Sequence, residues 1–320
     1  MNAEWSMHRR QLLGMLGGSA VLAAGWGAPS PAADAARAGG RLALHEDGTS
    51  SLPGEAALDL DDPGSRVRAF VKTSARLDAG RVIWATRAEV YAFLPPDRLV
   101  PAVRVKGCEQ QWIRPLSDTE FLSFDSLVSY YCDFESDEVM REFDNPFTGA
   151  RNAVRPNISR MTEGREISPR GVVYRVMRRA YPEFYAESDF DVVIRQVGDT
   201  VSFQGENRWP DEFIRPPAGS KLSMFARSAD LAAPDLSSAP ASFAGHVLMP
   251  FFPWMEMADR PGHLLWHVQG YKITSLEDLD EDYLAAAHAD LGDRFEKSPE
   301  FDSEPSRFAQ RLKAMGRLPD

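Results

Sequence analysis

The chain has 320 residues, of which 43% are hydrophobic, enough to bury a substantial core in one large domain or two small ones. Acidic residues outnumber basic ones by 47 to 36, which gives a formal net charge of −11, and no run of lysine or arginine interrupts this background. The balance argues against binding to nucleic acid and to anionic membrane surfaces.

The N-terminus has the pattern of a targeting segment. Arg9 and Arg10 precede an uncharged run over residues 11–33, and Ala33-Asp34-Ala35 follows as a small-residue cleavage site. The segment resembles a twin-arginine export signal, which is read by the twin-arginine export machinery. We therefore expect residues 1–35 to be a signal peptide and the protein to be periplasmic or secreted after cleavage near Ala35. The alternative is an uncleaved membrane anchor, which the glycines and the small-residue end disfavour.

Residues 36–61 carry glycine, serine and proline with little apolar periodicity, which predicts a flexible linker. From Arg66 onward, residues alternate with a period of two, which is typical of strands. The expected strands before the middle of the chain lie at residues 66–73, 81–94, 99–106, 111–115, 120–132, 139–143 and 151–155.

Further strands are expected in the second half of the chain. Gly198-Asp199 between two β-branched runs predicts a hairpin with a two-residue turn, because glycine takes the positive φ of that turn without strain. The hairpin joins residues 191–197 to residues 200–209. The remaining expected strands lie at residues 171–178, 221–228, 242–251 and 262–273, and a loop is expected at residues 231–240.

Helices are expected only at the end of the chain. Thr274 or Ser275 can cap a helix that runs to residue 290, and Gly292 would stop it. Pro305 can open a second short helix that runs to Met315.

About ten short strands with no long helix between them predict a mainly β fold, an antiparallel β-barrel of lipocalin or calycin-like shape with short C-terminal helices. The expected barrel domain spans residues 62–275, and residues 276–320 form helices packed on it. A closed or nearly closed barrel can hold a small ligand in its mouth.

Three segments carry a family resemblance. They are residues 82–93 with Tyr91, the turn Asn145-Pro146-Phe147-Thr148-Gly149, and the motif Met249-Pro250, Trp254-Met255-Glu256-Met257, Arg260-Pro261-Gly262 and Gly270. Together they resemble the bacterial family of domain of unknown function 1838 (DUF1838), over roughly residues 62–272. The family has no established activity, so the resemblance implies domain identity and no mechanism.

The segment over residues 245–272 concentrates the reactive side chains. His263 and His267 are four residues apart, which places them on one face of either a strand or a helix. With Glu256, they predict general acid/base catalysis, and Arg260 is expected to hold an oxyanion. The alternatives are a salt bridge from Arg260 to Asp259 or Glu256, and a divalent metal on the histidines, for which the spacing matches no known motif.

Aromatic and polar residues around this segment are the candidates for ligand contacts. The predicted ligand-binding residues are Trp254, Trp266, Trp209, His246 and Asn145, although a tryptophan is more often ordinary core and Asn145 can be a turn former alone. The sequence identifies no cofactor and assigns no metal. The two cysteines, Cys108 and Cys132, form a disulfide only if their strands are neighbours.

Two functions remain open. The first is an exported enzyme, an isomerase, lyase or hydrolase, that acts on a small hydrophobic molecule in a barrel cavity by acid/base chemistry. The second is a non-catalytic periplasmic carrier of such a molecule, in which the same polar groups only orient the ligand.

Overall fold

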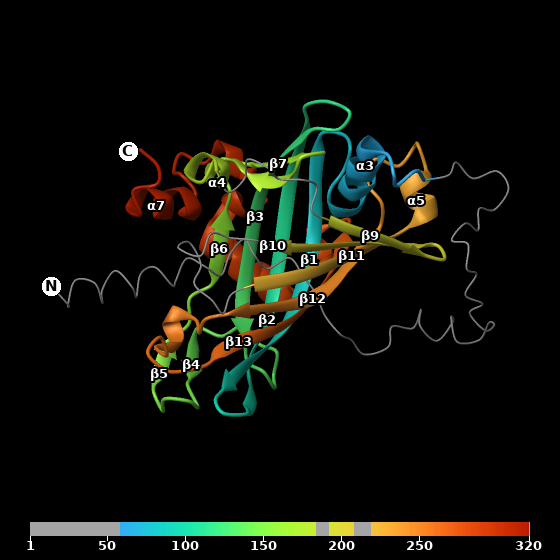
Figure 1. Cartoon of the computed structure of the whole chain (residues 1–320). Coiled ribbons are helices and arrows are strands. Elements are labelled where there is room, and N and C mark those ends of the chain that lie inside the picture. The colour runs from blue at the N-terminus through green and yellow to red at the C-terminus, as the bar shows by residue number, and fades with distance from the viewer. Residues whose placement is uncertain (1–57, 184–191, 208–218, 320) are drawn as a thin grey trace, which may run out of the picture.

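A computed structural model describes residues 58–183, 192–207 and 219–319. The predicted signal peptide, nearly all of the predicted linker and Trp209 lie outside these residues. The described part is mainly β, and one curled antiparallel sheet dominates it (Figure 1). The predicted fold class, with its lipocalin-like shape, is confirmed, whereas the division of the chain at residue 275 stays a prediction.

The large sheet has eleven strands in the order β8-β7-β3-β2-β1-β13-β12-β11-β10-β9, and β6 pairs with β3 beside β7. Within the described residues no ladder joins β8 to β9, so the sheet curls without closing. Its strands are β1 (Gly80–Leu94), β2 (Arg98–Pro115), β3 (Phe121–Cys132), β6 (Asn157–Arg160), β7 (Arg165–Ser168), β8 (Gly171–Tyr174), β9 (Val192–Val197), β10 (Thr200–Asn207), β11 (Gly219–Arg227), β12 (Ala241–Met249) and β13 (His263–Ile273). A separate hairpin pairs β4 (Glu142–Asp144) with β5 (Arg151–Ala153).

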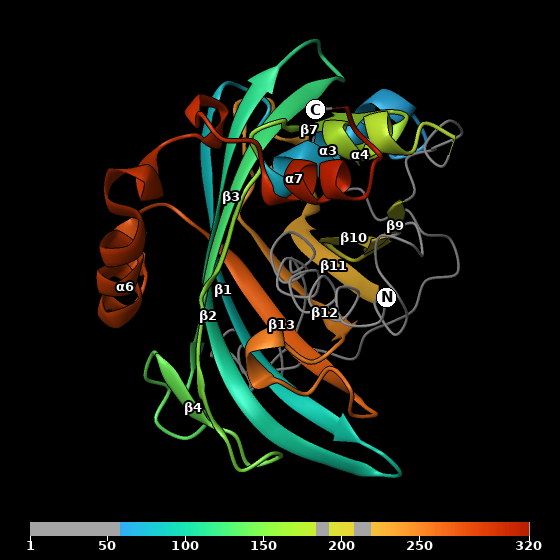
Figure 2. The same ribbon diagram turned by 90° about the vertical axis from the view of Figure 1, so that its left-hand side faces the viewer.

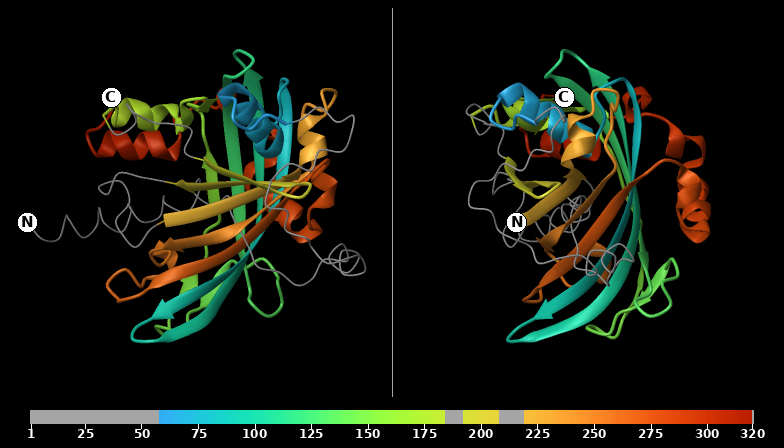
Figure 3. Two further views of the ribbon diagram at one scale, coloured as in Figure 1. Left: turned by 45° about the vertical axis from the view of Figure 1, so that its right-hand side comes forward. Right: turned by 90° about the vertical axis from the view of Figure 1, so that its right-hand side faces the viewer.

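Helices cover both faces of the curved sheet (Figures 2 and 3). On the concave side lie α3 (Pro63–Ser74), α4 (Arg175–Ala180) and α7 (Arg307–Ala314), while α6 (Glu281–Leu291) lies on the convex side. Tyr283 and Ala287 of α6 pack on Ile83, Cys108 and Val128. The remaining short helices are α5 (Ser228–Ala232) and the 3₁₀ turns η1 (Pro253–Met255), η2 (Leu276–Asp278), η3 (Gly292–Glu296) and η4 (Pro299–Phe301).

The strand expected at residues 66–73 is wrong, because this segment is α3. Asp62 caps the helix by accepting a hydrogen bond from Ser65 N at 2.7 Å, and Pro63 occupies the first helical position. Val67, Phe70 and Val71 then bury one face. The two-residue alternation was misleading here, and the Asp-Pro start signal identifies the helix.

Three other expectations need correction. Residues 99–106 and 111–115 belong to one strand, β2, which runs without a break through Gly107. The segment over residues 171–178 changes from β8 to α4 after Tyr174. The long helix expected from residue 275 to 290 is split into η2 and α6, since Ser275 forms a capping box with Asp278 and closes a short first turn.

Lys272 fastens α3 to the sheet. Its Nζ donates to Lys72 O at 2.9 Å, Ala75 O at 3.1 Å, Ser238 Oγ at 3.1 Å and Ala239 O at 2.9 Å. Burial, and then Arg76, lower the pKa of Lys272 to about 7, and its amine supplies a donor to carbonyls at the end of α3.

We expect Lys272→Met to lower the free energy of unfolding by about 2–4 kcal/mol, because the buried acceptors lose their donor. Chemical denaturation measures this loss, and Lys313→Met, an exposed change on α7, is the control. A loss below about 0.5 kcal/mol for Lys272→Met would contradict the role of Lys272 as the donor that connects α3 to the sheet.

The two cysteines are free and buried in the outer layer of the sheet. Cys108 is opposite Val128, whereas Cys132 is opposite Arg104, so the two side chains are not cross-strand partners. Among the described helices, none combines the length and apolarity needed to cross a membrane.

Candidate functional site

The three histidines of the predicted site lie on the convex face of the sheet. Trp266 faces the concave side, where it packs on Phe252, and side chains alternate along a strand. His263 and His267 on β13 therefore point outward, as does His246, the cross-strand partner of His267. The histidines therefore do not face the concave side, where a ligand held by the barrel would lie. Their proposed catalytic roles stay predictions.

On the convex face the histidines join a small polar group. The rings of His246 and His267 are 5.0 Å apart between centroids, and Tyr91 donates to Glu89, which is opposite His267. Burial, and then the neighbouring His246, lower the pKa of His267, against the opposing effect of Glu89. Across the described chain, no three His, Cys, Asp or Glu side chains are placed to hold a metal ion.

Glu256, Arg260 and Asn145 belong to a structural junction. Arg260 Nη1 donates to Phe147 O at 2.5 Å, and Asn145 Nδ2 donates to Met255 O at 2.8 Å. The predicted turn over residues 145–149 and the loop that carries the family motif are thus fastened together. Glu256 is exposed at the end of η1 with φ 55°, and among the ion pairs of the described residues none joins Arg260 to Asp259 or Glu256. The Asn145 amide nitrogen donates to Asn152 Oδ1 and Met255 O, and its amide oxygen accepts from Phe147 N. The side chain therefore stabilises the turn.

The loop that contains Trp254 folds over one end of the concave face. Phe252 contacts Tyr131 and Trp266 at 4.6 and 5.5 Å between ring centroids, and Trp254 stacks on Phe252. Met255 and Met257 are buried in the same cluster. The predicted ligand contacts Trp254 and Trp266 therefore belong to an apolar layer that fills this end of the sheet.

A buried polar cluster lies farther along the same concave face. We define it as Glu109 and Gln111 of β2, Asp125 of β3, Arg165 of β7 and Tyr174 of β8. Cross-strand register puts them on one face, because Gln111 is opposite Asp125 and Arg165 is opposite both Ser123 and Tyr174. Glu109 is opposite Trp84, which belongs to the concave core.

The cluster contains two carboxylates and one guanidinium, all buried. Arg165 Nε lies 3.2 Å from Asp125 Oδ2, with the two side chains 12% and 6% exposed. Gln111 Nε2 donates to Glu109 Oε1 at 2.8 Å, and Ser123 Oγ donates to Asp125 Oδ1. One positive charge therefore faces two groups that can each become negative.

This imbalance sets the protonation of the cluster. Burial, and then the Asp125 carboxylate, raise the pKa of Glu109 to about 8, while Arg165 and Gln111 oppose the shift. Burial alone would lower the pKa of Arg165, but the neighbouring Asp125 carboxylate and the groups of Tyr174 and Glu109 raise it. At neutral pH Glu109 is mostly a neutral acid beside an ion pair.

Several buried polar atoms on this face have no hydrogen-bond partner among the described residues. They are Thr86 Oγ1, Gln111 Oε1, Asp125 Oδ2, Arg165 Nε and Trp266 Nε1. For Arg165 the N–H is close to Asp125 but not directed at it. Buried polar atoms are normally paired, and within the described residues Thr86 Oγ1, Gln111 Oε1 and Trp266 Nε1 have no hydrogen-bond partner of either kind.

The cluster is walled by apolar layers. The aromatic loop lies at one end, and α3 lies at the other, where Phe70 packs on Phe203 of β10. Tyr174 stacks on Phe308 of α7, which closes a third side. Charge interactions strengthen in such apolar surroundings.

Sequence reasoning missed this cluster for an identifiable reason. Glu109 fell in the gap between two expected strands, so its alternation with Gln111 along one strand was not visible. A continuous strand over residues 98–115 puts Glu109 and Gln111 on the same face as Val105 and Val103. Polar residues that continue an otherwise apolar face are the signal that indicates a buried functional site.

Fold and site together define an open antiparallel half-barrel with a buried acid cluster on its concave face. Residues 215–311 match the model of a family described as protein of unknown function (DUF1838). The predicted family is thereby confirmed for these residues, which include the motif of the loop between β12 and β13. The match does not extend to the strands that carry Glu109, Asp125 and Arg165. No curated protein sequence matches the chain.

Proposed function

We propose that the protein binds a small molecule on the concave face and acts on it by general acid/base chemistry. The unpaired donors and acceptors around Gln111 and Thr86 carry this proposal, since a ligand with hydroxyl or carbonyl groups satisfies both kinds. The apolar layers beside them suit the hydrophobic part of such a ligand.

Glu109 is the proton donor in this proposal. A neutral carboxylic acid at pH 7 can pass its proton to a ligand oxygen, and the resulting carboxylate is then stabilised by the Arg165 guanidinium. Asp125, 3.2 Å from Arg165 Nε, keeps the guanidinium oriented. Tyr174, half-buried next to Arg165, holds a neutral phenol that orients the ligand.

The test is to purify the protein from its native host and identify bound small molecules by mass spectrometry. Wild type is then expected to convert the bound molecule, whereas Glu109→Gln binds it but turns it over at least about 100-fold more slowly. Equal turnover by both proteins, or the absence of any bound molecule, would overturn the proposal. Binding without conversion by wild type would favour the carrier function instead.

We also propose export through the twin-arginine pathway, supported by the N-terminal arginine pair and the small-residue run. Replacing Arg9 and Arg10 together with lysine is expected to keep the protein in the cytoplasm. Cell fractionation measures this, and periplasmic protein in unchanged amount would contradict the assignment.

A further inference from the structure

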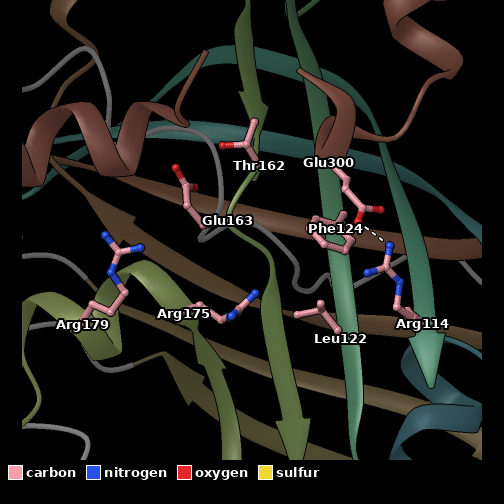
Figure 4. A pocket seen from close by; sticks show the side chains of 8 residues that line it. All are labelled: Arg114, Leu122, Phe124, Thr162, Glu163, Arg175, Arg179 and Glu300. Atoms are coloured by element: carbon pink, nitrogen blue, oxygen red, sulfur yellow. Dashed lines mark hydrogen bonds and ion pairs between the residues drawn. The ribbon is translucent and has the colours of Figure 1, made fainter. Parts of the chain in front are cut away.

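A pocket of about 340 Å³ lies outside the concave cluster, at the edge of the sheet where β3 meets β6 and β7. Its floor is Leu122 and Phe124, which point away from the concave face because Ser123 and Asp125 point toward it. Figure 4 shows the Arg114–Glu300 pair at one end, Arg179 at the other, and Arg175 between them.

Most charged side chains of this pocket already have a partner within the protein. Arg114 forms an ion pair with Glu300 and lies over the Phe124 ring at 5.6 Å. Glu163 Oε1 accepts from Ser306 N at 3.1 Å, and so fastens the cap of α7.

Arg175 and Arg179 have fewer partners: Arg175 shares one, and Arg179 has no ion pair among the described residues. They are four residues apart on α4, so their side chains share one face of the helix, and both residues are exposed. Among the described residues, Arg175 pairs with Glu166 alone, at 3.4 Å, and Glu166 is also paired with Arg178. Two like charges at this spacing destabilise a short helix unless an anion lies between them.

We propose that Arg175 and Arg179 form a second ligand site, which takes the oxyanion of a small molecule, a phosphate or a carboxylate. The two guanidinium groups present planar forks that match such oxyanions. Leu122 and Phe124 contact the apolar remainder of the ligand. This site does not depend on the proposed acid/base function, because its lining shares no residue with the buried polar cluster.

The test is a calorimetric titration of the full chain with inorganic phosphate and, separately, with hexanoate. We expect one of these probes to bind wild type in the millimolar range, and Arg179→Gln to weaken that binding at least about tenfold. Arg179→Lys keeps the charge but loses the fork, so it is expected to bind with intermediate affinity. Binding of phosphate alone identifies a phosphate ligand, and binding of hexanoate alone identifies a carboxylate.

Arg195→Gln, an exposed change on β9, is the control and is expected to bind as wild type does. Circular dichroism confirms that each variant is folded. The proposal is overturned if neither probe binds wild type, or if Arg175→Gln/Arg179→Gln binds as tightly as the control.

Discussion

Replacing Arg165 with methionine is expected to destabilise the protein by about 3–5 kcal/mol, because removal of one partner leaves a buried carboxylate uncompensated. Asp125 lies beside Arg165 at 3.2 Å, and Glu109 is within its electrostatic reach. Arg165 lowers the pKa of Glu109, so its removal favours the protonated form of Glu109 in the folded protein, and the loss is expected to grow as the pH rises from 5 to 8. Urea denaturation at several pH values measures it.

The matched control is Arg227→Met, which breaks a surface pair with Asp199 whose two side chains are both exposed. Surface pairs contribute about 0–1 kcal/mol, so this variant should stay close to wild type. A loss below about 1 kcal/mol for Arg165→Met would contradict a buried, charge-balanced cluster.

Replacing Glu109 with glutamine is expected to change the pH dependence of stability. The pKa of Glu109 is about 8 in the folded protein, against 4.5 for an unperturbed glutamate. Between these values the unfolded chain releases the proton while the folded protein keeps it, so the free energy of unfolding falls as the pH rises. Glu109→Gln removes this slope and gains stability over wild type, on the order of a few kcal/mol near pH 8.

Denaturation at pH 5, 6.5 and 8 measures this difference, and Glu135→Gln, an exposed carboxylate in a turn, serves as the control that keeps the wild-type slope. Parallel profiles for wild type and Glu109→Gln would show that Glu109 is ionised in the folded protein, and the proton-donor role would then be lost.

Local signals in the sequence were enough to predict most of the sheet. Gly198 has φ 60°, as the predicted hairpin between β9 and β10 requires, and Gly292 with φ 53° ends α6 where expected. These features depend on neighbouring residues alone. The end of α3 and the continuity of β2 depend on partners far along the chain, such as Lys272 for α3.

The orientation of the site was not predictable in the same way. Trp266 and His267 are adjacent on β13, so they point to opposite faces and cannot both line one cavity. Which face is concave follows from the curl of the whole sheet, which local periodicity does not report. Arg165 and Asp125 were overlooked because charged residues are ordinarily expected at the surface, and their burial depends on pairing across β3 and β7.

The most direct measurement is native mass spectrometry of protein from its native host, which compares Gln111→Leu with His267→Leu. Both changes put leucine in a strand, one on the concave face and one on the convex face. We expect the wild-type protein and His267→Leu to retain the same bound small molecule, and Gln111→Leu to lose it. Retention by Gln111→Leu together with loss by His267→Leu would contradict the concave cluster as the functional site.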